Sequence, residues 1–376
     1  MFRMTLMTLL DVFSDLKEFR ADNHRYPLPH LVFTAVCMIL CGADDWKMVS
    51  KLAKRKQKWL KKYIPLPHGA PSQHTFRRVF ASLDPEQFRE CFIQWVSTIT
   101  ERTHGEVIAI DGKTLRRSYD RQDDKAAIHM VNAWASATGM VLGQLKTAEK
   151  SNEITAIPAL LDMLEVSGCI ISTDAMGCQK DIAQKIRSKG ADYLLAVKGN
   201  HETLHEDIKL FLDHLACQKK LPESASYHET LDKGHGRIEV RRCWISTDVI
   251  WLDQRSKWKD LNMIGVVEGE RHEGGKVSIE RRYFISSLIT DAATFMSAVR
   301  SHWSVENNLH WSLDISFRED GCRIRKRYGA ENMAVFRQIA LNLLSQEKTE
   351  KLGMMNKRIT AAADDEYLEL LLQGVI

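Results

Sequence analysis

Two short segments, each ending in an aspartate, constrain the fold of this chain most strongly. Residues 107–110 are apolar and mostly β-branched, and this run stops at Asp111, where Gly112 turns the chain. Residues 169–173 form a second short strand pattern that runs into Asp174. Because ligands bind in open α/β folds at the carboxyl ends of the strands, a carboxylate at such a position faces a ligand site. We therefore predict an α/β domain with both aspartates at one edge of its sheet.

Residues 101–216 alternate between strand and helix patterns. The predicted strands are 107–110, 127–134, 140–147, 169–173 and 193–197, and the predicted helices are 152–166, 179–189 and 201–216. The early strands are separated by turns and the later ones by helices, which indicates a mixed sheet rather than a doubly wound parallel one. This order of elements is that of the ribonuclease-H-like fold, in which Asp111 falls on the first strand and Asp174 on the fourth.

Three further regions flank or interrupt this domain. The segment at about 217–290 predicts a β-rich insertion, with strand patterns at 237–246, 263–268 and 277–286, and helices return at 291–317 and 329–346. Residues 1–100 predict an N-terminal all-helical domain, 101–350 the α/β domain, and 351–376 a C-terminal tail.

The N-terminal domain carries the densest positive charge. Residues 46–63 contain many lysines and no acid, and a turn rich in proline and glycine follows. Ser72 is predicted to cap a helix at 73–82 that carries Arg77 and Arg78. A helix, a turn and a short basic helix resemble a helix-turn-helix, whose cations suit phosphate contacts. A solvated basic face on a helical bundle stays open as the alternative.

Composition places the chain in an ordinary class. It has 376 residues, 44% hydrophobic and 27% charged, with a net charge of only +4, so an argument for a polyanionic partner has to rest on local clusters. The longest apolar run, 31–41, is too short to span a bilayer, and the N-terminus shows no cleavable signal pattern. Its eight cysteines lack a C-x-x-C pair. We expect a cytoplasmic protein with reduced thiols and no membrane partner.

Glu306 supplies a third carboxylate, within a helical pattern flanked by tryptophans. Carboxylate oxygens suit Mg²⁺, and two divalent ions about 4 Å apart can activate an attacking oxygen and stabilise a leaving one at a phosphodiester. We predict that Asp111, Asp174 and Glu306 hold Mg²⁺ or Mn²⁺ for phosphodiester cleavage. Simple turn chemistry at each aspartate is the structural alternative. A one-helix zinc site of His302, Glu306 and His310 is another.

Two other motifs compete with this interpretation. His201-Glu202-Thr-Leu-His205 matches H-E-x-x-H, the zinc-peptidase pattern, and keeps a peptidase open as an alternative. Its metzincin extension is missing, because Ile208 and Phe211 stand where glycine and histidine are needed. Gly112-Lys-Thr resembles the end of a P-loop but lacks the leading glycine, which excludes that motif.

Five motifs, in this order, resemble the H-repeat-associated transposases, an ISAs-type group of insertion-sequence proteins within the DDE superfamily. They are Ile108-Ala-Ile-Asp-Gly-Lys-Thr-Leu-Arg-Arg-Ser118, Lys150-Ser-Asn-Glu-Ile-Thr-Ala-Ile-Pro158, Thr173-Asp-Ala-Met-Gly-Cys-Gln-Lys180, Asp192-Tyr-Leu-Leu-Ala-Val-Lys-Gly-Asn200 and His302-Trp-Ser-Val-Glu-Asn-Asn-Leu-His-Trp311. Residues 71–78 are similar to the domain that precedes the catalytic one in that family. The resemblance covers nearly the whole chain.

The resemblance implies a ribonuclease-H-like catalytic domain with the triad Asp111, Asp174 and Glu306, and Mg²⁺ or Mn²⁺ as cofactor. It implies a DNA transposase that hydrolyses phosphodiesters at element ends and transfers strands into target DNA. The partners implied are double-stranded DNA, namely the inverted-repeat ends and the target, and a second copy in a homodimer. In the cytoplasm such a protein associates with the nucleoid when it binds DNA. A catalytically decayed DNA-binding remnant, and a nuclease without strand transfer, are the alternatives.

The chain departs from the wider superfamily pattern Tyr-x2-Arg-x3-Glu-x6-Lys around the third carboxylate. Val299, His302 and Leu313 stand at the Tyr, Arg and Lys positions. We therefore expect other basic residues to bind the DNA near the cleaved phosphodiester. The candidates are Lys113, Arg116, Lys198, His235, Arg237, Arg300, His302, His310, Arg323 and Arg325, with Arg77 and Arg78 in the N-terminal domain.

Overall fold

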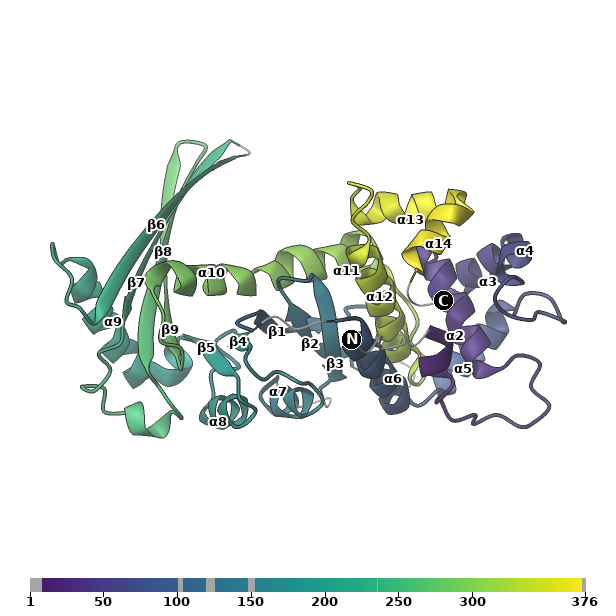
Figure 1. The fold of residues 1–376 in the computed structure, drawn as a ribbon, viewed down its shortest axis with the longest axis horizontal. Helices are drawn as coiled ribbons and strands as arrows, with labels where there is room; N and C mark the ends of the chain where they lie inside the picture. The colour runs from purple at the N-terminus through teal and green to yellow at the C-terminus, as the bar shows by residue number, and fades with distance from the viewer. Residues whose placement is uncertain (1–8, 101–103, 120–125, 148–152, 235, 374–376) are drawn as a thin grey trace, which may run out of the picture. The chain divides into compact units, whose positions relative to one another are not determined.

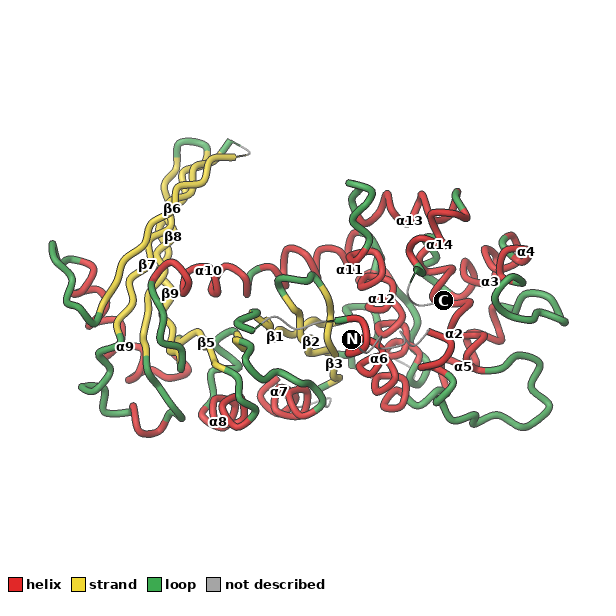
Figure 2. Tube along the Cα trace, in the orientation of Figure 1, coloured by secondary structure: helices red, strands yellow, loops and turns green. Residues whose placement is uncertain are grey.

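The computed structural model describes residues 9–100, 104–119, 126–147, 153–234 and 236–373, drawn in Figures 1 and 2. The chain forms two compact units. Unit 1 comprises residues 1–102, 112–150 and 306–376, and unit 2 comprises 103–111 and 151–305. Strand β1 (Val107–Thr114) contributes residues to both units. No helix within the described ranges is long and apolar enough to cross a membrane.

Unit 2 is built on a mixed sheet. Its further strands are β4 (Ile170–Thr173), β5 (Asp192–Val197), β6 (Ala225–Gly234), β7 (Arg237–Ser246), β8 (Met263–Glu273) and β9 (Lys276–Ser286). Strands β1, β4 and β5 run parallel, while β9 pairs antiparallel with β5 and is followed outward by β8, β7 and β6, all antiparallel. The predicted mixed α/β fold is confirmed, and the β-rich segment proves to extend the same sheet.

Helices cover both faces of the β5–β9 region. The helical segments of unit 2 are α7 (Glu153–Asp162), α8 (Lys180–Ser188), η1 (Gly199–His201), α9 (Glu202–Ala216), η2 (Arg255–Lys257) and α10 (Ala292–His302). Tyr283 of β9 donates to Asp213 of α9, whereas the neighbouring Phe284 packs edge-on against Phe295 of α10. Because successive strand residues point to opposite faces, α9 and α10 lie on opposite sides of the sheet.

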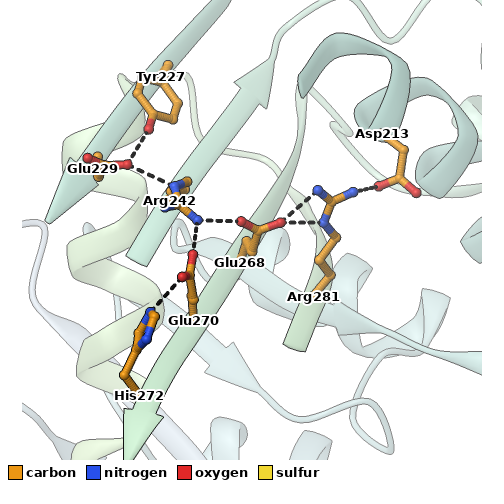
Figure 3. A network of polar contacts seen from close by, with 8 residues as sticks. All are labelled: Asp213, Tyr227, Glu229, Arg242, Glu268, Glu270, His272 and Arg281. Atoms are coloured by element: carbon orange, nitrogen blue, oxygen red, sulfur yellow. Dashed lines mark hydrogen bonds and ion pairs between the residues drawn. The ribbon is translucent and has the colours of Figure 1, made fainter. Parts of the chain in front are cut away.

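The strands β6 to β9 extend beyond the helices of unit 2, as Figure 1 shows. We call this four-stranded part of the sheet the blade. A network of ion pairs joins them on one face (Figure 3). Arg242 of β7 contacts Glu229 at 2.8 Å, Glu268 at 2.9 Å and Glu270 at 2.7 Å, and Arg281 of β9 contacts Glu268 at 2.7 Å. Hydrogen bonds from Arg242, and then from His272, lower the pKa of Glu270. Opposite charges facing each other across strands stabilise the register.

Unit 1 is mainly helical. Its elements are α1 (Leu9–Phe13), α2 (Leu28–Leu40), α3 (Trp46–Arg55), α4 (Gln57–Leu60), α5 (Gln73–Ser82), α6 (Pro85–Ile99), β2 (His129–Ala135), β3 (Met140–Lys146), η3 (Val305–His310), α11 (Trp311–Ile315), η4 (Glu319–Gly321), α12 (Gly329–Gln346), α13 (Met354–Ala363) and α14 (Asp365–Leu371). Val305, the first residue of η3, still belongs to unit 2. Helix α12 is buried along most of its length. It holds the β2–β3 hairpin through polar contacts, since Gln338 donates to Asn132 at 2.7 Å and to Gln144 at 2.6 Å. Strands β2 and β3 complete the sheet order β3-β2-β1-β4-β5-β9-β8-β7-β6.

Several elements differ from the sequence prediction. The single helix predicted at 291–317 is wrong: α10 ends at His302, a π-helix covers Val305–His310, and α11 follows. Strand β6 was not predicted, and the C-terminal tail forms helices α13 and α14. The predicted cap at Ser72 is confirmed, because its hydroxyl accepts the Thr75 backbone N–H at 3.2 Å.

Candidate active site

The register of two parallel strands brings Asp111 and Asp174 to adjacent positions. Val107 of β1 pairs with Ile170 of β4, and the pairing continues to Ile110 and Thr173. Asp111, within β1, and Asp174, directly after β4, are the next residues in sequence, and neighbouring strands lie about 4.8 Å apart. Asp111 is half-buried and Asp174 is exposed. The two carboxylates therefore lie where the parallel pairing of β1 with β4 ends. The predicted stop of the first strand at Asp111 is wrong, because β1 continues through Gly112 to Thr114.

A turn directly after β4 fixes the carboxylate of Asp174. Its Oδ1 accepts the backbone N–H of Met176 at 2.9 Å and that of Gly177 at 3.3 Å. Gly177 is needed there, because a Cβ at that position would lie 2.6 Å from the Cβ of Thr173 and 3.0 Å from Ile157. The Asp-x-x-Gly spacing thus serves both the orientation of the carboxylate and the close packing beneath it.

A Gly177→Ala variant tests this packing. We expect it to lower the free energy of unfolding by about 1–3 kcal/mol, because the added methyl overpacks a buried site. Urea unfolding of the full chain measures the loss. Gly199→Ala is the matched control, since a Cβ at Gly199 meets no atom within 4 Å. Equal stability of the two variants would contradict the close approach at Gly177.

A small pocket of about 120 Å³ lies beside Asp174, lined among others by Lys198, Arg282, His302 and Trp303. His302 Nδ1 lies 3.0 Å from the hydroxyl of Ser172, which ties the end of α10 to β4. Burial lowers the pKa of His302 to about 4, although the charge of Asp174 opposes this shift. The imidazole is therefore neutral at neutral pH, and the positive charge of the pocket comes from Lys198, Arg281 and Arg282.

Arg282 was missed by the sequence analysis. Its guanidinium lies 3.9 Å from the ring centre of Trp303 and forms an ion pair with Glu280 at 2.7 Å. An arginine inside a strand pattern carries no signal that would distinguish it from a solvated side chain. Only the pairing of β9 with β5 brings it to the strand that ends near the pocket.

Glu306 lies exposed in the π-helix η3. It belongs to unit 1, whereas Asp111 and Asp174 belong to unit 2. Short π-helical turns occur frequently at functional sites, which makes this position notable. His310, at the end of the same turn, has its pKa lowered to about 4 by burial and by the charges of Lys113 and His129. Across the described part of the chain, no group of three or more His, Cys, Asp or Glu side chains is close enough to hold a metal ion.

The pair of carboxylates that follows the last paired residues of β1 and β4 suits a hard divalent cation. Two carboxylates supply oxygen ligands, and Mg²⁺ keeps several waters while binding only one or two carboxylates plus substrate phosphate. The turn after β4 holds one of these carboxylates through backbone N–H groups, which leaves its second oxygen unused by those bonds. The residues present therefore fit a magnesium or manganese ion.

Lys113 stands apart from the other basic residues predicted to contact DNA. It is only 8% exposed, and its ammonium lies 2.7 Å from Asp314, 3.6 Å from Asp320 and 3.7 Å from Glu319. Its neighbour Arg116 is exposed and pairs with Asp320 at 3.2 Å. The side chain of Lys113 is thus surrounded by carboxylates of unit 1.

The remaining predicted DNA contacts lie in both units. Lys198, Arg77, Arg78 and Arg323 are exposed. Arg237 pairs with Glu239 at 3.1 Å, Arg300 pairs with Asp232 at 3.4 Å, and the Arg325 guanidinium lies 4.4 Å from the ring centre of Tyr119. His235 lies outside the described residues. DNA contacts by these side chains stay predictions.

The two histidines of the zinc-peptidase pattern contact different partners. His201 precedes helix α9 and its Nε2 lies 2.6 Å from the carbonyl oxygen of Cys178, with the ring against Trp258. The ring of His205 packs edge-on against Tyr283. This arrangement uses one histidine for a backbone contact and the other for packing, so the geometry gives the peptidase alternative no support.

Comparisons with known proteins cover almost the whole chain. The family described as "Transposase DDE domain" matches residues 102–343, and the one described as "DDE_Tnp_1-associated" matches 10–96. The protein named "Putative transposase YncI" from Escherichia coli O157:H7 is 40% identical, over 98% of this chain and 95% of its own length. The "H repeat-associated putative transposase YhhI" of Escherichia coli strain K12 is 39% identical over 99% of both chains.

Proposed function

This chain belongs to the family of transposases with a DDE domain, and from that premise we propose that it is an insertion-sequence DNA transposase. It would hydrolyse phosphodiesters at the inverted-repeat ends of its element and join the freed ends to target DNA. The observation that carries this proposal is the parallel register that sets Asp111 beside Asp174. The strand order β3-β2-β1-β4-β5 supports a ribonuclease-H-like catalytic domain.

We assign Glu306 as the third carboxylate. His302, at the end of α10, contacts Ser172 of β4. Ser172 lies two residues before Asp174 in the sequence. Glu306 follows four residues after His302, within the motif 302–311 that resembles the family's third-carboxylate region. Its position in an exposed π-helical turn further supports a functional role.

Asp111, Asp174 and Glu306 would hold one or two Mg²⁺ or Mn²⁺ ions. When bound, such ions activate the attacking water or 3′-hydroxyl and neutralise charge that develops on the phosphate. The protein positions one carboxylate through the turn after β4, and Lys198 and Arg282 add positive charge beside it. Positive side chains near the cut attract the DNA backbone and raise the rate of encounter.

The proposed substrate, DNA, determines which partners the chain would bind. Double-stranded DNA would be bound at two places, the element ends and the target, and the handling of two ends makes a homodimer the expected active form. In the cytoplasm the protein would associate with the nucleoid while bound to DNA.

The direct test is incubation of the purified chain with Mn²⁺ and the DNA that flanks its gene. We expect nicks at the ends of the element, mapped to the nucleotide, that disappear when EDTA removes the ion. Supplied pre-cut ends should then be joined to a target duplex. Nicking without joined product would indicate a nuclease that lacks strand transfer. DNA binding with no metal-dependent nick would indicate a decayed, DNA-binding remnant.

A further inference from the structure

A large basic groove lies within unit 1. It has a volume of about 1370 Å³, and its walls come from the start of α3, from α5, from the segment 318–326 and from α13. Seven of its lining residues carry positive charge and come from all four of these segments: Lys47, Arg77, Arg318, Arg323, Arg325, Lys326 and Arg358. Segments more than two hundred positions apart in the sequence thus build one charged surface.

The acidic residues of the groove are engaged in holding the fold. Asp44 accepts from the guanidinium of Arg358 at 2.8 Å, and Arg358 is only 1% exposed. Asp45 caps helix α3 by accepting the backbone N–H of Met48 at 2.8 Å. Asp44 also lies 4.0 Å from the guanidinium of Arg318. Two carboxylates thus face seven cations in the lining, so most of the positive charge of the groove is uncompensated.

Several of the cations have no acidic partner of their own. Lys47, Arg77 and Arg323 are exposed, and none forms an ion pair within the described ranges. Arg325 is instead held in place, because it donates to the carbonyl oxygen of Arg117 at 2.9 Å and lies over the ring of Tyr119. Exposed cations brought together without counter-charges repel one another, so the arrangement is stabilised by a bound polyanion.

We propose that this groove binds the sugar–phosphate backbone of duplex DNA, independently of base sequence. Guanidinium groups match phosphate geometry, and contacts to phosphate carry no direct sequence information. The groove exceeds the size of usual small-ligand pockets, roughly 300–1,000 Å³, which favours a polymer over a free anion. The proposal rests on the proposed function only for the choice of DNA as the polymer. None of its residues belongs to the carboxylate set.

The test is the binding of a labelled random-sequence DNA duplex to the full chain, in EDTA, over a range of salt concentrations. The variant is Arg77→Gln with Arg323→Gln. We expect its affinity to fall at least about tenfold, and the slope of log Kobs against log salt to decrease by about 2, because each phosphate contact contributes about one. A second variant, Lys47→Gln with Arg77→Gln, leaves the segment 318–326 untouched and should behave alike.

The matched control is Lys54→Gln with Arg55→Gln, which removes two exposed cations of α3 that do not line the groove. Unchanged affinity and slope in the groove variants, or an equal loss in the control, would overturn the proposal. Because EDTA prevents metal-dependent cleavage, this outcome is independent of catalysis. A chain that binds through the groove but never nicks DNA with Mn²⁺ would contradict the proposed function alone.

Discussion

An Asp111→Asn variant is expected to lose Mn²⁺-dependent nicking by at least about a thousandfold while it binds DNA as the unchanged chain does. The carboxylate lies beside Asp174 where the parallel pairing of β1 with β4 ends. Replacing it with an amide removes a negative metal ligand but keeps its size, and a bound metal contributes several kcal/mol to such a transition state. Mapped nicking of end-containing DNA, with binding measured in EDTA, gives both quantities.

Asp174→Asn should cause a similar loss, and the double variant should lose little more than either single one. Residues that act as a unit on one site give strongly non-additive effects. Asp181→Asn provides the control, since Asp181 is an exposed acid in α8 of the same unit. Loss of folding in the Asp111 variant, with cleavage retained by the folded fraction, would instead assign that aspartate to turn chemistry.

The strand residues that precede these aspartates could be predicted from the sequence because burial imposes a clear pattern there, although β1 does not end at Asp111 but continues to Thr114. The four residues before Asp111, and those before Asp174, are buried on both sides of the sheet, so each reads as an uninterrupted strand. Their pairing could not be derived from periodicity alone. The succession of turns and helices between the strands predicted the strand order, and the observed topology agrees with that prediction.

Strand β6 escaped prediction for the opposite reason. Most of its residues are polar and exposed or half-buried, because it forms the edge of a blade that has solvent on its outer parts. Its position is fixed by charges on neighbouring strands, such as Glu229 facing Arg242. Such cross-strand pairs join residues distant in sequence, and no local pattern reveals them.

The π-helix at Val305–His310 could not be predicted from the sequence either. The sequence around Glu306 has apolar residues at helical spacing, which predicts one continuous α-helix. A local widening of the helix depends on packing rather than on residue type. It changes which side chains share a face, and the one-helix zinc site of His302, Glu306 and His310 was based on α-helical spacing.

Lys113 gives the second large effect, and here we expect a loss of stability rather than of DNA binding. Lys113→Met should lower the free energy of unfolding by about 3–5 kcal/mol, since breaking a buried ion pair leaves an uncompensated charge. Glu319, only 3% exposed, would lose one of its two cationic neighbours and keep Arg337 at 3.4 Å. Methionine preserves the apolar stem of the lysine, so packing changes little.

The pH dependence of this variant follows from the direction of one shift. Burial raises the pKa of Glu319 above its ordinary 4.5, and Lys113 is one of the charges that oppose this rise. Without Lys113 the pKa of Glu319 in the folded state rises further. The folded variant then binds a proton at Glu319 still more strongly than the unfolded chain does. The destabilisation should therefore be small below pH 4.5 and grow as pH rises through the folded pKa. Urea unfolding at pH 4 and pH 8 measures the difference, and adding Glu319→Gln should restore part of the loss.

Arg116→Met separates this role from a general effect of positive charge. Its side chain is 79% exposed and pairs with Asp320, so its removal should change stability by less than about 1 kcal/mol. If Lys113→Met were as stable as the unchanged chain but bound DNA more weakly, the predicted DNA contact of Lys113 would hold after all. If it is destabilised and its folded fraction binds DNA normally, Lys113 serves to hold the segment of Asp314 and Glu319 against β1. That segment leads into Arg323 and Arg325, so a buried lysine would then support the phosphate-binding groove without touching DNA.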